Sequence, residues 1–77
     1  MQITILFFGQ LTDITGQQSI QLEDVADTDA LVIRLHQQFP ALANSKYAIA
    51  IDKKVINSNT LLTNNCHVAL LPPFSGG

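Results

Sequence analysis

A single segment of this 77-residue chain has the periodicity of an amphipathic helix, and it constrains how everything else can pack. Within residues 29–39 the apolar positions fall on one stripe, made of Leu31, Val32, Leu35 and Phe39. Thr28 is a suitable N-cap before this segment, and Pro40 ends it. Because one helix cannot bury its stripe alone, it must pack against a sheet.

The other apolar residues lie in short alternating segments that predict five strands. These segments are residues 2–8, 18–22, 47–51, 54–56 and 66–71, with a tight turn at Asp52-Lys53. The sequence of residues 9–16 predicts a loop that is long enough to include one helical turn. The order of elements predicts an α+β fold of the β-grasp, or ubiquitin-like, kind. In it, a mixed sheet packs on one main helix, with the first and last strands at its centre.

The last residues of the sequence predict a tail with its own chemistry. They are Pro72, Pro73, Phe74, Ser75, Gly76 and Gly77. The two prolines fix φ and lack an amide donor, so they stop the last strand and begin a stiff, extended segment. The two glycines lack a Cβ, so they can enter a narrow channel and leave the terminal carbonyl open to a nucleophile. We expect a domain at residues 1–71 and a tail at residues 72–77.

Composition argues against several classes of function. The net charge is −2 with only four basic residues, and they form no stripe, which argues against nucleic acid and anionic membranes as partners. Cys66 is the only cysteine and is expected to be a small buried residue rather than a sulfur relay. His36 and His67 lack metal-ligand spacing, so we expect no metal site. No signal-peptide pattern or segment of membrane-spanning length is present, and we expect a cytoplasmic protein.

Three apolar residues are expected on the face of the sheet opposite the core, where polar side chains are usual. Phe8, Leu71 and Val55 (or its neighbour Ile56) are expected near the end of the sheet from which the tail departs. An exposed apolar patch beside a functional tail indicates a protein interface. The alternative is that these side chains simply complete a small core.

The whole chain resembles the MoaD family, the small sulfur-carrier subunits of molybdopterin synthase. Residues 5–10 (Ile-Leu-Phe-Phe-Gly-Gln) resemble the first strand and turn of that family, and residues 68–77 resemble its tail. The Pro-Pro pair placed before the terminal Gly-Gly is the most specific part. Two segments depart from the family: Leu70-Leu71 stands where an aromatic pair is frequent, and residues 64–67 stand where an acidic turn is frequent.

The resemblance implies a carrier that supplies sulfur and no catalytic pocket. An adenylating enzyme of the MoeB, ubiquitin-activating type would use ATP to adenylate Gly77, with Gly76 beside it, and a sulfur donor would then produce a thiocarboxylate. The molybdopterin synthase large subunit, of the MoaE type, would take up the tail in a heterotetramer. There, sulfur would pass to cyclic pyranopterin monophosphate, and the catalytic lysines would belong to that subunit. The resemblance places docking contacts on Phe8, Val55 and Leu71, and the carrier itself would bind no cofactor.

Three other functions fit the same pattern. One is a sulfur carrier of another pathway, such as thiamine synthesis or tRNA thiolation. A second is a ubiquitin-like modifier that forms isopeptide bonds through Gly77. A third is a β-grasp domain that only mediates interactions.

Overall fold

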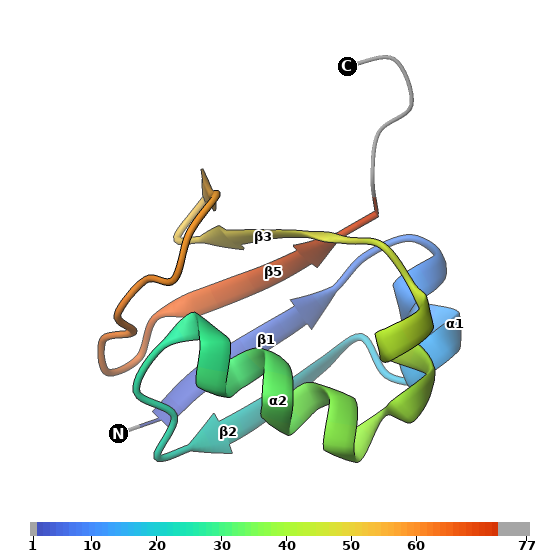
Figure 1. The fold of residues 1–77 in the computed structure, drawn as a ribbon, viewed down its shortest axis with the longest axis horizontal. Coiled ribbons are helices and arrows are strands. Elements are labelled where there is room, and N and C mark those ends of the chain that lie inside the picture. The colour runs from blue at the N-terminus through green and yellow to red at the C-terminus, as the bar shows by residue number, and fades with distance from the viewer. Residues whose placement is uncertain (1, 73–77) are drawn as a thin grey trace.

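Residues 2–72 are described by the computed structural model, and they form a five-stranded sheet with one long helix across one face (Figure 1). In chain order the elements are β1 (Gln2–Phe7), α1 (Gln10–Thr15), β2 (Ser19–Glu23), α2 (Thr28–Gln38), a 3₁₀ helix η1 (Pro40–Asn44), β3 (Ala48–Ile51), β4 (Lys54–Ile56) and β5 (His67–Leu71). The predicted α+β arrangement of a mixed sheet on one main helix is confirmed.

The sheet has the strand order β2-β1-β5-β3-β4. The first and last strands, β1 and β5, are parallel neighbours inside the sheet, as predicted, and Ile5 lies opposite Val68. All other pairings are antiparallel, including the predicted hairpin of β1 with β2. The turn at Asp52 and Lys53 has positive φ at both residues, which is the two-residue hairpin geometry that matches the twist of the flanking strands.

The segment predicted as a loop with one turn is instead the short helix α1. Six residues are too few to form a stable helix alone, so tertiary contacts must hold it. Leu11 supplies that contact, since its side chain is fully buried, and the hydroxyl of Thr15 donates to the Leu11 carbonyl at 3.1 Å. Gly16 ends the helix in the left-handed conformation, and its N–H donates to the Thr12 carbonyl at 2.8 Å.

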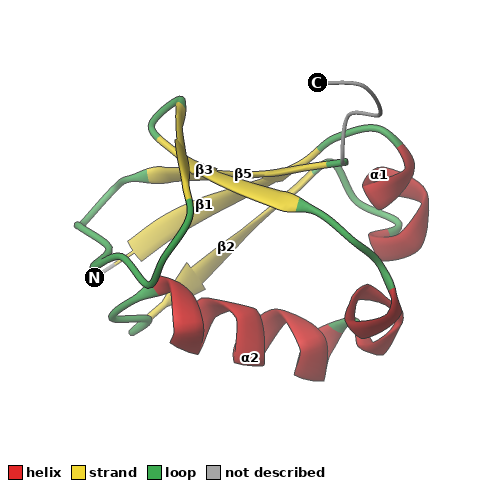
Figure 2. Cartoon of the chain, turned by 45° about the horizontal axis from the view of Figure 1, so that its top comes forward, coloured by secondary structure: helices red, strands yellow, loops and turns green. Residues whose placement is uncertain are grey.

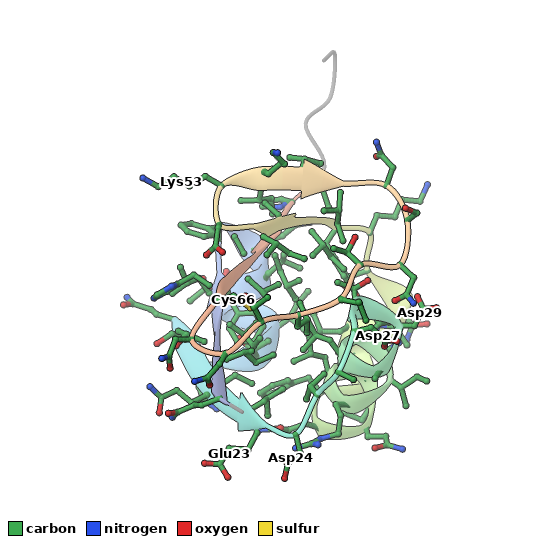
Figure 3. All side chains as sticks on the ribbon, turned by 90° about the vertical axis from the view of Figure 1, so that its left-hand side faces the viewer. Glu23, Asp24, Asp27, Asp29, Lys53 and Cys66 are labelled. Atoms are coloured by element: carbon green, nitrogen blue, oxygen red, sulfur yellow. The ribbon has the colours of Figure 1, made fainter. Side chains whose placement is uncertain are left out.

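The start of α2 differs from the prediction by one residue. Asp27, not Thr28, is the N-cap, and its carboxylate accepts the Ala30 N–H at 2.9 Å. Thr28 is buried, and its hydroxyl donates to the amide oxygen of Asn59 at 3.1 Å. That amide oxygen also accepts the Asp29 N–H, so the loop before β5 holds the first turn of α2 (Figure 3).

The helical stripe packs into the core at Leu31 and Leu35, as the periodicity predicts, whereas Val32 is half-buried and lines a surface hollow. Leu31 and Leu35 are fully buried, and each contributes about 1.5–3 kcal/mol as an upper estimate. Phe39 is only half-buried because it follows the last helical turn. Its ring packs edge-on against the ring of Phe7, with the two ring centroids 5.7 Å apart. Ile3, Ile5, Phe7, Val68 and Leu70 complete the core from the sheet.

Removing the cap of α2 should destabilise the domain by a measurable amount. We expect Asp27→Ala to lower the free energy of unfolding by about 1 kcal/mol, because the Ala30 N–H loses its acceptor. Asp27→Asn keeps a capping oxygen and should lose less. Urea unfolding measures both variants, and equal losses would contradict the capping role.

Candidate functional site

The tail begins where the pairing of β5 ends. Leu71 forms the last pair, opposite Ala48 of β3, and the Phe8 N–H donates to the Leu70 carbonyl at 3.2 Å. Pro72 follows and cannot donate to the sheet, so its position agrees with the predicted stop. The remaining tail residues assigned from the sequence, Pro73, Phe74, Ser75, Gly76 and Gly77, lie outside the described residues.

Pro72 lies directly against the backbone of Gly9. A Cβ placed on Gly9 would be 2.7 Å from Cγ of Pro72, closer than two non-bonded carbon atoms approach in proteins. Gly9 also has a φ of +57°, which favours glycine. The turn after β1 and the root of the tail are therefore packed together. No local pattern in the sequence indicates this contact.

A continuous apolar patch covers the sheet face opposite α2. Strand register places Leu6, Ala69, Ala50 and Val55 in one row across β1, β5, β3 and β4. Leu71 and Ala48 form the next pair, nearer to the tail, and Phe8 follows β1 beside them, with its N–H donating to the Leu70 carbonyl. We call these seven residues the outer-face patch. In the described part of the chain, the helices lie on the other side or at the end of the sheet (Figure 2).

The three residues singled out from the sequence all belong to the outer-face patch. Phe8 is 44% exposed and Val55 is 55% exposed, whereas Leu71 is half-buried. Ile56 lies opposite Ile49, whose side chain packs against the core, so Val55 is the outward residue of that pair. Their role in docking a partner stays a prediction.

The other patch members were missed for a simple reason. Ala48, Ala50 and Ala69 are small and give no strong apolar signal, and Ala50 is only 4% exposed. Only the register of β3 against β5 shows that they connect Val55 to the residues of β1. Leu6 was identifiable, because it alternates in phase with Phe8.

Phe8 stands between two hollows of about 350 Å³ each. One lies on the outer face, lined by Leu6, Phe8 and Ala69 and edged by Asp52, Lys53 and His67. The other lies beside Gly9 and Thr12 and again includes Leu6 and Phe8. An exposed aromatic ring between hollows with polar edges is typical of a protein-binding surface.

The cysteine and the hydrogen-bonded pair of Tyr47 and His36 are not members of the outer-face patch. The Cys66 side chain is 3% exposed and belongs to the core. Tyr47 and His36 share a hydrogen bond of 2.8 Å, and burial raises the pKa of the Tyr47 phenol above its ordinary value. No three His, Cys, Asp or Glu side chains within residues 2–72 are grouped to hold a metal ion. None of the helices in the described chain is long and apolar enough to cross a membrane.

Comparison with known proteins identifies relatives over the full chain. The model of the ThiS family matches residues 5–77. A molybdopterin synthase sulfur carrier subunit from Haemophilus influenzae is 31% identical, over 97% of this chain and 99% of the relative. The resemblance to sulfur carriers of molybdopterin synthase is thereby confirmed.

Solved structures agree with the fold. A chain of the protein-protein complex of subunits 1 and 2 of molybdopterin-converting factor from Helicobacter pylori has a TM-score of 0.75 and 24% identity, with full coverage of both chains. Small archaeal modifier protein 1 from Haloferax volcanii has a TM-score of 0.82 and 18% identity, also with full coverage of both. At these identities the likeness shows the ubiquitin-like β-grasp fold alone.

Substitutions at two adjacent phenylalanines should distinguish a core residue from a residue of the outer-face patch. Phe7→Ala should lower the free energy of unfolding by about 3–5 kcal/mol, because Phe7 is 4% exposed. Phe8→Lys should change it by no more than about 1 kcal/mol, since the site is open and the lysine stem can cover apolar neighbours. Urea unfolding of both variants tests this, and a large loss for Phe8→Lys would assign Phe8 to the core.

Proposed function

The chain belongs to the ThiS family, and on that premise we propose that it is the sulfur carrier subunit of a molybdopterin synthase. The proposal rests on one observation: the outer-face patch lies beside Pro72, where the tail begins, at one end of the sheet. The curated relative from Haemophilus influenzae, which this chain matches over nearly its whole length, supports the pathway. A cytoplasmic location is part of this proposal.

In the proposed chemistry, the reactive group is the carboxylate of Gly77. A carboxylate is a poor electrophile, so an adenylating enzyme would join it to AMP, with pyrophosphate leaving from ATP. Sulfide supplied by a sulfur donor would then attack the acyl carbon and form a C–S bond as the C–O bond to AMP breaks, which leaves a thiocarboxylate. That group is ionised at neutral pH and is a soft nucleophile that needs no neighbouring base. Two carriers in turn would deliver the two sulfurs of the dithiolene to cyclic pyranopterin monophosphate.

The outer-face patch is the proposed docking surface for the large subunit. Its apolar rows lie beside Pro72, so a partner that covers them would be placed next to the tail. Asp52, Lys53 and His67 at the edge supply the polar rim that protein interfaces usually have. The pocket that binds the pterin and its catalytic groups would then belong to the partner, with Phe74 and Ser75 of the tail passing into it.

The carboxyl end can be tested directly. Deleting Gly77, or adding one alanine after it, should abolish sulfur transfer because the adenylated carboxylate is lost or displaced. The thermal midpoint should not change, since the core is built from residues 2–72. Circular dichroism and a sulfur-transfer assay measure the two effects. Full activity without Gly77 would contradict the proposal.

The docking surface is tested by charge substitution. Phe8→Lys and Leu71→Asp should each weaken binding to the large subunit by about 30-fold or more, because an interface anchor is worth about 2 kcal/mol and a buried unpaired charge adds to the loss. Ile33→Lys is the matched control, since Ile33 is 60% exposed on α2 and lies outside the outer-face patch. Calorimetric titration of folded variants measures the affinities. If all three variants bind like the wild type, the partner docks elsewhere.

A further inference from the structure

We propose that Gly9 is a positioning residue for the tail, because its bare backbone forms the surface on which Pro72 rests. The inference rests on the proposed function, in which the tail delivers sulfur. In this inference, a residue near the N-terminus sets the direction in which the C-terminal tail leaves the domain.

The contact leaves no space for a side chain on Gly9. A Cβ there would lie 2.7 Å from Cγ, 3.6 Å from Cδ and 3.8 Å from Cβ of Pro72. The atom that collides belongs to a five-membered ring closed on the backbone, so it cannot turn away as the end of a flexible side chain would. Relief requires that the backbone of Gly9 or of Pro72 moves.

Gly9 is held firmly enough to direct Pro72. On one side, Phe7 pairs with Leu70, and the Phe8 N–H donates to the Leu70 carbonyl at 3.2 Å. On the other side, the Gly9 carbonyl accepts the Thr12 N–H at 3.1 Å, while the Thr12 hydroxyl donates to the Phe7 carbonyl at 3.2 Å. Leu11 then anchors α1 in the core. A substitution at Gly9 should therefore displace Pro72 more than the turn.

A displacement at the root matters because the reactive group lies farther along the chain. Five residues follow Pro72, and a fully extended segment of that length reaches about 17 Å. A small change of angle at Pro72 changes where Gly77 arrives in a partner. Misplacement of a reacting group by about 1 Å can lower a rate by on the order of a hundredfold.

Gly16, which follows α1, provides a control for a Cβ at positive φ; the ψ of −137° at Gly9 has no counterpart there, and the Pro72→Ala background controls for it. It also has a positive φ, +72°, but a Cβ on Gly16 would have nothing within 4 Å. Gly16→Ala therefore introduces left-handed backbone strain without touching the tail. The Pro72→Ala variant provides the second control, since it removes the Cγ atom that Gly9→Ala would strike.

The test is a double-substitution cycle on the full-length thiocarboxylated chain with the large subunit. With Pro72 present, Gly9→Ala should lower kcat for sulfur transfer by about tenfold or more, with a smaller effect on KM. With Pro72→Ala present, the same substitution should lower kcat by less than about threefold, because the collision is gone. Gly16→Ala should change kcat by less than about twofold. Equal losses from Gly9→Ala in both backgrounds would overturn the proposal.

A measurement on the free chain separates this inference from the proposed function. Nuclear Overhauser contacts between the Gly9 α protons and the Pro72 ring should be present in the wild type. They should change in Gly9→Ala while contacts of the Ile5–Val68 pair persist. Their absence from the wild type would overturn the inference even if the chain carries sulfur. If they are present but the wild-type chain accepts and transfers no sulfur, the proposed function fails instead.

Discussion

The parallel pairing of β1 with β5 is the interaction on which the other features depend. It joins segments more than sixty residues apart and places both strands inside the sheet. Parallel strands need a long connection, and here that connection includes α2, which covers one face of the pair (Figure 1). The same register places the end of β1 beside the end of β5. Phe8, Gly9, Leu71 and Pro72 therefore meet at one place.

The two faces of the sheet differ in burial: one supplies the core, and the other carries the proposed docking surface. Side chains that alternate toward α2 are almost fully buried, and they account for the core. Those that alternate outward carry the outer-face patch, where Phe8 and Val55 stay largely accessible. Because Phe7, the last residue of β1, is buried and Phe8, which follows it, is exposed, the two residues can be changed for different effects. A small domain can in this way keep a stable core beside an apolar binding surface.

Sequence patterns predicted those features that depend on local periodicity. Alternation identified β1 and β5, and the stripe of Leu31 and Leu35 identified the helix, because each pattern lies within one element. The N-cap was misassigned because Asp27 and Thr28 are both good caps, and only a distant contact with Asn59 decides between them. Residues 9–16 were expected to form a loop with one helical turn rather than the six-residue helix α1, since the stability of α1 comes from burial of Leu11 rather than from its own sequence. The contact of Gly9 with Pro72 depends on strand register, which no local pattern contains.

The proposed function requires a sulfur-bearing group at Gly77, and intact-mass spectrometry of the chain isolated from its own cells tests this requirement most directly. We expect a population whose mass differs from that of the unmodified chain by the exchange of one oxygen for one sulfur. That population should disappear on treatment with a thiol-selective alkylating reagent and reappear as the alkylated species. A pool made of high-mass adducts to other proteins, with no sulfur-bearing form, would contradict the account and identify a protein modifier.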